Sequence, residues 1–338
     1  MNSHSKLATN YLGIPLKNPI VPSASPLSKN SDTAKKLEDA GASALVMYSL
    51  FEEEMIEEGE NLDYLIQGQS LGTAEADSYL PLPDCYKNCL DLYLEQLVRL
   101  KKTLEIPIIA SLNGITNGGW IEHAKDIEDA GADALELNIY YIPTDINESG
   151  AQVEARYIEI LQTVKKQISI PVTCKLTSQF SSPGHFIKQL EAAGADGVSL
   201  FNRFYQPDIN LQSLEIDPQL SLSTPYESLL RMHWIALIYE QTKLSLAATG
   251  GIHDVQAVIK LLLAGADITH LCSVLLKQGP AVIKTILDNL TQWLDQNDYE
   301  SVTQLKGSVS KGKAINPIAF ERVNYLEVLQ GHSSLFTK

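Results

Sequence analysis

One phrase recurs four times along the chain: an apolar helical pattern ends in Ala-Gly-Ala, and a short apolar run follows. The copies are LEDAGASALVMYS (37–49), IEDAGADALELNIYY (127–141), LEAAGADGVSLFN (190–202) and LLLAGADITHLCS (261–273). The glycine of each copy stands where a helix C-terminus favours a left-handed residue. The phrase therefore predicts a helix that leads directly into a strand, and its repetition predicts that this unit recurs along the chain.

Eight runs of strand type are spread along the 338 residues, and a helical pattern follows each of them. Strands that are almost continuously apolar and separated by helices indicate a parallel sheet with both faces covered. Eight such units within roughly 250 to 300 residues predict the α/β fold of a (β/α)8 TIM barrel, with an open doubly wound sheet as the alternative. The runs are 18–24, 44–49, 107–113, 134–139, 171–176, 197–202, 244–251 and 268–276.

The connections between these runs predict a single domain, residues 1–338, with its barrel at about 17–297. Long βα loops after the second, fourth and sixth strands are expected to lie over the C-terminal face as lids or binding walls. Alternation in INLQSLEI (209–216) predicts a small hairpin in the third of these loops. The tail 298–338 is expected to pack helically outside the barrel. Its Lys306, Lys311 and Lys313 are expected in a solvated loop or, alternatively, over a phosphate.

Charge and hydropathy exclude several classes of partner. The net charge is −15 and the chain has no basic stripe, which argues against a nucleic-acid partner. No stretch approaches about 18 consecutive apolar residues, so no membrane span is expected. The first residues, MNSHSKLATNYLGIPLKNP, lack the apolar core of a signal peptide. We therefore expect a cytoplasmic protein that binds neither nucleic acid nor membrane.

The carboxyl ends of the predicted strands carry polar residues or glycine, and these ends form the active site of a TIM barrel. Polar strand ends can simply mark the start of loops, but this explains three asparagines and a lysine less well than it explains serines. Gly250-Gly251 and HLCSVLLKQGP (270–280) follow the last two strands, where such barrels bind phosphate through backbone N–H groups. The strand-end residues are Ser23, Ser25, Ser49, Asn113, Asn138, Lys175, Asn202, Thr249, Gly250, Cys272 and Ser273.

Several segments, taken in order, resemble the dihydroorotate dehydrogenase family, which comprises FMN enzymes on a (β/α)8 barrel. Their order along nearly the whole barrel carries the resemblance more than any single motif does. ELNIYYIPTD (136–145) and FNRFYQPDI (201–209) are similar to a bacterial branch described as dihydroorotate-dehydrogenase-like. The matching segments are NPIVPSASPLS (18–28), ALELNI (134–139), VTCKL (172–176), ADGVSLFNRF (195–204), TPYESLLRMHWIAL (224–237), ATGGIHD (248–254) and GADITHLCSVLLKQGP (265–280).

The resemblance implies a flavin site at the strand ends. Lys175 would stabilise the negative charge that builds on the flavin during hydride transfer, and Asn138 and Asn202 would hold the substrate. Lys175 shares a strand face with Thr173, so it can point into the barrel mouth; alternatively, it snorkels from a strand end or pairs with an inward Glu136. The implied FMN-binding residues are Ala24, Ser25, Ser49, Asn113, Asn138, Lys175, Asn202, Gly250, Gly251, Cys272 and Ser273.

The family's catalytic base is replaced in this sequence. In the family, a Cys or Ser three residues after the Asn takes a proton from the substrate, and Tyr141 stands at that position after Asn138. An unperturbed phenol has a pKa of about 10, against about 8.5 for a thiol. A catalytic Tyr141 therefore requires a nearby cation or a buried polar setting that lowers its pKa. Alternatively, Tyr140 and Tyr141 stack beside the flavin ring or wall off the pocket.

Other departures from the family pattern also fall on its substrate side. The family's Lys after the second strand falls on Tyr48, and its asparagine-bearing orotate loop falls on SYLPLPD (78–84), which has no Asn. Its glycine-rich phosphate loop is changed to LSLSTP (220–225), where Ser223 and Thr224 could donate hydrogen bonds instead. The resemblance thus implies that the flavin half of the site is kept and the dihydroorotate half is rebuilt.

We weigh three hypotheses. The first is an FMN-dependent oxidoreductase acting on a CH–CH bond, with dihydroorotate of pyrimidine biosynthesis as the default substrate and Tyr141 and Lys175 as catalytic residues. The second is a phosphate-binding barrel lyase that forms a Schiff base on Lys175. The third is a flavin-binding relative that has lost turnover. The resemblance further implies fumarate or a partner flavoprotein as electron acceptor, and a homodimer.

Overall fold

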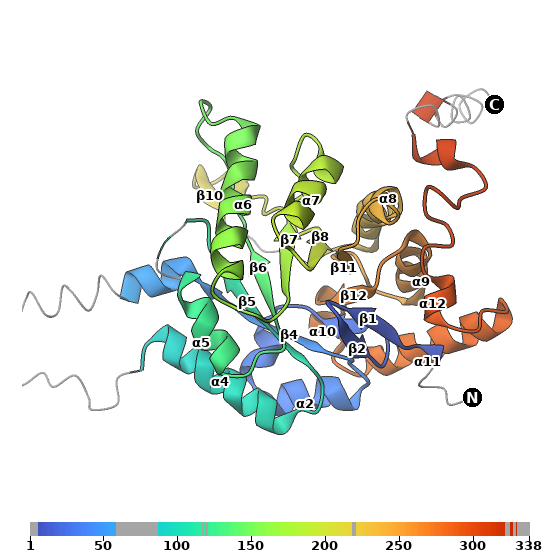
Figure 1. Cartoon of the computed structure of the whole chain (residues 1–338), viewed down its shortest axis with the longest axis horizontal. Coiled ribbons are helices and arrows are strands. Elements are labelled where there is room, and N and C mark those ends of the chain that lie inside the picture. The colour runs from blue at the N-terminus through green and yellow to red at the C-terminus, as the bar shows by residue number, and fades with distance from the viewer. Residues whose placement is uncertain are drawn as a thin grey trace, which may run out of the picture.

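The computed structural model describes residues 6–58, 87–116, 118, 121–217, 221–321, 325, 326 and 329. Eight parallel strands form a nearly closed ring (Figure 1), which confirms the predicted (β/α)8 TIM barrel. They pair in the order β3-β12-β11-β8-β7-β6-β5-β4, and Ser43 N–H donates to Ile20 O at 3.0 Å where the two end strands meet. The strands are β3 (Ile20–Pro22), β4 (Leu45–Phe51), β5 (Ile108–Asn113), β6 (Ala134–Asn138), β7 (Val172–Leu176), β8 (Gly197–Leu200), β11 (Ser245–Thr249) and β12 (Ile268–Leu271).

Helices surround the ring of strands (Figure 1) and bury an apolar layer against it. Polar side chains at their first residues satisfy free backbone N–H groups. Asn88 and Ser149 form capping boxes, and Asp254 accepts a hydrogen bond from Ala257 N–H at 2.9 Å. The helices are α2 (Ser31–Asp39), α4 (Cys89–Thr103), α5 (His123–Asp129), α6 (Gly150–Lys165), α7 (Pro183–Ala192), α8 (Ser228–Ile238), α9 (Val255–Ala264), α10 (Ser273–Gln278), α11 (Val282–Gln296), α12 (Val302–Leu305) and the 3-10 turns η1 (Pro26–Lys29), η3 (Pro225–Glu227) and η4 (Pro317–Phe320).

The glycines of the repeated phrase end their helices as the sequence predicts. Gly41, Gly131, Gly194 and Gly265 have positive φ angles of 113°, 96°, 100° and 125°. At Gly265 a Cβ atom would also lie 2.4 Å from the Tyr239 ring, so this position has no room for a side chain. Each phrase is therefore a helix, a tight left-handed turn and a barrel strand.

A short antiparallel hairpin, β1 (Thr9–Tyr11) and β2 (Ile14–Leu16), closes the amino-terminal end of the barrel. Tyr11 and Leu12 pack there against barrel-interior residues such as Ile109 and Ala134. Tyr11 Oη donates to Thr173 Oγ1 at 3.1 Å. This hairpin is not among the elements predicted from the sequence. Because it fills the amino-terminal end, the carboxyl end is the one left for a ligand.

Two predictions about local structure have opposite outcomes. The strand predicted at 268–276 is wrong beyond Leu271, because the chain turns at Cys272 and α10 begins at Ser273. Periodicity alone does not separate a short buried strand from a short buried helix. The hairpin predicted within 209–216 is confirmed, since β9 (Asp208–Asn210) pairs antiparallel with β10 (Glu215–Asp217).

The tail packs on the outside of the barrel, with α12 and η4 as its regular elements within residues 298–321. Val309 N–H donates to Leu263 O, and Lys311 N–H donates to Ala236 O, each at 2.9 Å. Lys306 pairs at 2.5 Å with Asp267, which precedes β12 at the amino-terminal end of the barrel. Lys306 is thus at the opposite end from the strand rim. Among the residues that the structure describes, no helix has the length and apolarity needed to cross a membrane.

Candidate active site

The strand register places three predicted site residues side by side. Asn113 of β5 is in register with Asn138 of β6, and Asn138 is in register with Lys175 of β7. Residues in register on neighbouring parallel strands point to the same face of the sheet. Asn113, Asn138 and Lys175 therefore form one continuous row at the carboxyl ends of the strands.

A cavity of about 160 Å³ lies at this rim. Seven residues predicted to bind the flavin line this cavity: Ala24, Lys175, Asn202, Gly250, Gly251, Cys272 and Ser273. The other lining residues, not predicted as flavin ligands, are Ser23, Phe201, Arg203, Ser223, Thr249, Ile252 and His270.

Lys175 forms an ion pair inside the barrel. Its Nζ lies 3.5 Å from Oε1 of Glu136, and the two side chains are only 8% and 0% exposed. Glu136 Oε2 also accepts a hydrogen bond from Ser199 Oγ at 3.3 Å. A buried charge without a partner is destabilising by several kcal/mol, so each of the two ions stabilises the other. Lys175 therefore pairs with Glu136 and also lines the cavity at the barrel mouth, so the two alternatives expected for it occur together.

His270 of β12 is a buried cavity residue that the sequence analysis missed. It is 2% exposed, and neither ring nitrogen has a hydrogen-bond partner within the described part of the chain. Burial lowers the pKa of His270 to about 4, so the ring is neutral at pH 7. A signal was present in the sequence, because His270 precedes the predicted ligand Cys272 by two residues and so shares its strand face.

The two predicted substrate-binding asparagines contact each other. Asn202 Nδ2 donates to Asn138 Oδ1 at 2.7 Å, and Asn202 Oδ1 accepts from Arg203 N–H at 3.0 Å. These two bonds fix the orientation of both amides, since each amide has one acceptor oxygen and two N–H donors. Within the described residues, the NH2 group of Asn138 makes no hydrogen bond.

Serine hydroxyls and glycine backbone gather on the opposite side of the cavity, around the end of β12. Ser223 donates to Ser273 Oγ through its own Oγ at 2.8 Å and its N–H at 3.1 Å. His253 Nε2 lies 3.2 Å from Ser223 Oγ, and burial lowers the pKa of His253. A Cβ atom on Gly251 would lie 2.3 Å from Ser228 N, so only glycine allows this close packing. Hydroxyl and N–H donors of this kind suit a phosphate.

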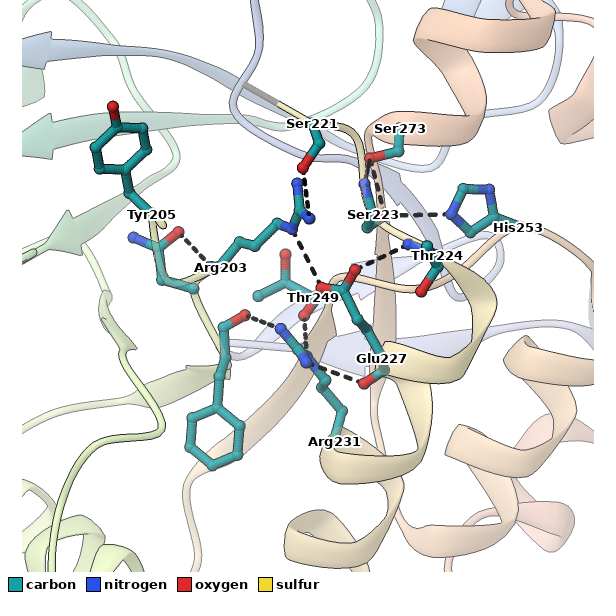
Figure 2. Close-up of polar contacts among 12 residues, drawn as sticks. Arg203, Tyr205, Ser221, Ser223, Thr224, Glu227, Arg231, Thr249, His253 and Ser273 are labelled. Carbon is teal, nitrogen blue, oxygen red and sulfur yellow. Dashed lines mark hydrogen bonds and ion pairs between the residues drawn. The ribbon is translucent and has the colours of Figure 1, made fainter. Parts of the chain in front are cut away.

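Arg231 of α8 holds this side of the rim together (Figure 2). Its guanidinium donates to Thr249 O at 2.9 Å, Glu227 O at 2.9 Å and Phe201 O at 3.1 Å. The residue is 5% exposed, and burial lowers its pKa. Arg231 therefore connects the ends of β8 and β11 to the start of α8. Arg231 is not among the site residues predicted from the sequence, although it lies in a segment that resembles the family.

Four predicted FMN-binding residues do not line the cavity. Ser25 precedes η1, where its carbonyl accepts a hydrogen bond from Ser28 Oγ at 3.0 Å. Ser49 Oγ lies 2.9 Å from Ser111 Oγ. The other two are Asn113 and Asn138, which continue the row that Lys175 begins.

Tyr141 lies outside the cavity lining, in a polar cluster with Glu148 and Arg156. Its Oη donates to Glu148 Oε2 at 2.5 Å, and the guanidinium of Arg156 lies 4.3 Å from the centre of its ring. Hydrogen bonding to Glu148 raises the pKa of Tyr141, and the opposing effect of Arg156 is smaller. The neighbouring Tyr140 Oη instead accepts a hydrogen bond from Tyr205 N–H at 2.7 Å. The cation expected beside Tyr141 is present, but the net direction of the pKa shift is upward.

Tyr48 stands where the family has a lysine after the second strand, and it has a structural role here. Tyr48 of β4 packs edge-on against Tyr93 of α4, with ring centres 5.1 Å apart. Tyr48 is thus part of the apolar layer between strands and helices. The segment 78–84, to which the family's orotate loop corresponds, lies outside the described residues.

Comparisons with known proteins cover most of the barrel. The family model for dihydroorotate dehydrogenase matches residues 86–294. The chain is 28% identical over 223 residues to dihydroorotate dehydrogenase A (fumarate) of Lactobacillus delbrueckii subsp. bulgaricus, which is 64% of this chain and 72% of that protein. It is 24% identical over 327 residues to dihydroorotate dehydrogenase B (NAD(+)), catalytic subunit, of Thermoplasma volcanium, which is 91% of this chain and 99% of that protein.

A parallel barrel with a buried cation, paired amides and a serine–glycine wall at its rim has the architecture of TIM-barrel enzymes, whose active sites lie at the carboxyl ends of the strands. The match to the family model identifies the family within this class. The chain belongs to the dihydroorotate dehydrogenase family, whose members are oxidoreductases that act on CH–CH bonds and generally bind FMN.

Proposed function

We propose that the cavity at the strand rim binds FMN and that the chain oxidises dihydroorotate or a closely related substrate. The observation that carries this proposal is that seven of the residues predicted to bind the flavin line one cavity: Ala24, Lys175, Asn202, Gly250, Gly251, Cys272 and Ser273. The names of the relatives, which include dihydroorotate in each case, support the substrate.

The donors present fit a riboflavin phosphate. Hydroxyls of Ser223 and Ser273 and the backbone of Gly251 suit a phosphate at one side of the cavity. At the other side, the buried ammonium of Lys175 suits the polar edge of a flavin ring, and Asn138 lies next to Lys175 in the strand register. When bound, FMN supplies the hydride acceptor. Lys175 would bring a fixed positive charge to the site, and Glu136 holds the ammonium in place without reorganisation.

Tyr141 stays the candidate proton carrier within this proposal. Its Oη donates to Glu148, and Arg156 holds the other oxygen of that carboxylate at 2.9 Å. For Tyr141 to take a proton from a substrate, its own proton must pass to Glu148 as the phenol oxygen accepts the new one. Glu148 is already in place as the acceptor for such a relay from phenol to carboxylate.

We also infer that residues 1–338 form one domain and that the enzyme is a cytoplasmic homodimer using fumarate or a partner flavoprotein as acceptor. Backbone hydrogen bonds from Val309 and Lys311 to α9 and α8 support the single domain. The β9–β10 hairpin supports self-association, since Leu211 and Leu214 are 84% and 78% exposed, and exposed apolar patches mark contact surfaces.

An absorption spectrum of the purified protein, repeated anaerobically with dihydroorotate, tests the function. We expect a yellow protein whose flavin band bleaches, and slower bleaching in Lys175→Ala. A yellow protein that dihydroorotate does not bleach would contradict the substrate. A colourless protein that borohydride traps with a carbonyl compound would instead indicate Schiff-base chemistry on Lys175, although the ion pair with Glu136 engages the amine which that chemistry requires.

A further inference from the structure

We propose that Arg203 binds the phosphate group of the flavin, an inference that rests on the proposed function. Arg203 follows Asn202 directly after β8 and lines the cavity together with Ser223, Ser273 and Gly250. Arg203 and Lys175 are the positively charged residues that line the cavity. Neither the strand-end pattern nor the family resemblance assigns a role to Arg203. Its position therefore adds a permanent cation to the side of the cavity that carries the hydroxyl donors.

The guanidinium of Arg203 is held in one orientation. Its Nε donates to Glu227 Oε2 at 3.2 Å, and its Nη2 donates to Ser221 Oγ at 3.4 Å. Glu227 is itself fixed, because its Oε1 accepts a hydrogen bond from Thr224 N–H at 2.9 Å. Figure 2 shows the head group between Ser221 and Glu227, beside the segment that carries Ser223. A group held this way loses little conformational freedom when it binds an anion.

These contacts leave part of the guanidinium available to a ligand. A guanidinium has five N–H donors in a planar fork, and Nη1 has no partner among the described residues. The side chain is 36% exposed, so it is neither sealed in the core nor extended into solvent. The planar fork matches two oxygens of a phosphate, which a single ammonium does not.

The neighbours of Arg203 favour a phosphate over a substrate carboxylate. Its head group lies toward Ser223, whose hydroxyl contacts Ser273 and whose carbonyl oxygen lies 3.4 Å from Lys277 Nζ. The amide row suited to a ring and substrate lies at the ends of β5 to β7, on the side away from these serines. The geometry thus divides the cavity into a phosphate side and a ring side, with Arg203 on the phosphate side.

Flavin affinities with and without the phosphate test the inference. The full-length protein is freed of flavin and titrated with FMN and with riboflavin, while flavin fluorescence reports binding. We expect Arg203→Gln to weaken FMN binding about 10- to 100-fold and to leave riboflavin binding within about twofold. Arg203→Lys should lose less, because it keeps the charge without the fork. Arg99→Gln, on the exposed face of α4, is the matched control and should change neither affinity.

Glu227→Gln separates phosphate binding from a purely structural role for the Arg203–Glu227 pair. It removes the negative charge of the ion pair but keeps an amide oxygen that can still accept from Arg203 Nε, so FMN affinity should be retained. A purely structural role for the pair predicts that both flavins bind more weakly. Equal losses of FMN and riboflavin in Arg203→Gln, or no loss, would overturn the inference. The inference would also be overturned if Arg203→Gln kept the ratio of FMN affinity to riboflavin affinity but bound orotate more weakly. That result would assign Arg203 to a substrate carboxylate. If the unmodified protein binds neither flavin, the proposed function fails with it.

Discussion

Replacing Glu136 by Gln should destabilise the fold strongly, because it leaves Lys175 buried without a counter-charge. The two charges are 3.5 Å apart, which corresponds to about 5 kcal/mol at an effective dielectric constant of about 20. Removing one partner of a buried pair typically costs about 3 to 5 kcal/mol of unfolding free energy. Gln keeps the size of the side chain and an acceptor for Ser199, so the loss measures the charge rather than a cavity.

A double-mutant cycle isolates this interaction. The free energy of unfolding is measured by urea titration with circular dichroism for Glu136→Gln, Lys175→Met and the double variant. We expect the double variant to lose at least about 2 kcal/mol less than the sum of the single losses. Glu159→Gln, on the exposed face of α6, is the control and should stay within about 0.5 kcal/mol of the parent. Additive losses, within about 0.5 kcal/mol, would refute an energetically coupled pair.

His270→Gln should make stability less sensitive to acid. The pKa of His270 is about 4 in the folded state and about 6.5 in the unfolded state, so the unfolded state binds more protons between these two pH values. The neutral ring therefore contributes about 3 kcal/mol to the free energy of unfolding above pH 6.5, and this contribution is lost as the pH falls toward 4. The free energy of unfolding, measured between pH 4 and pH 6.5 for the parent protein and for His270→Gln, checks this prediction. Tyr141→Phe should slow anaerobic flavin reduction by dihydroorotate about 100-fold in stopped-flow absorbance, whereas the matched Tyr140→Phe should change it little. Leu211→Asp should shift the proposed homodimer toward monomer in light scattering, and an unchanged mass would contradict self-association through the hairpin.

The barrel could be predicted because its determinants are local and repeated. Each copy of the phrase carries a helical apolar pattern, a glycine at positive φ and an apolar strand, and these features are independent of the rest of the chain. The β1–β2 hairpin could not be predicted in this way. Its strands have three residues each, and they are stabilised by contacts such as the one between Tyr11 and Thr173, which are 162 positions apart.

The rim residues were predictable to the extent that a strand fixes their direction. Alternation along β7 sends Thr173 and Lys175 into the barrel, and the register then places Asn138 beside Lys175. Alternation would equally have indicated His270. It could not indicate Arg231, because that residue acts from a helix on the carbonyl groups of three separate segments.

The position of Tyr141 shows where counting along a sequence stops being informative. Spacing from Asn138 assigns Tyr141 to the place of the family's base, but the strand ends at Asn138, and beyond it the direction of a side chain depends on loop contacts. Here those contacts are Glu148 and Arg156, and they hold the phenol with its proton directed at a carboxylate. A carboxylate that raises the pKa of the phenol makes it a weaker acid, yet the same carboxylate can accept the phenol's proton as the oxygen takes another. The chemistry at this position is therefore a property of the pair, and Glu148 is as much a part of the candidate proton path as Tyr141.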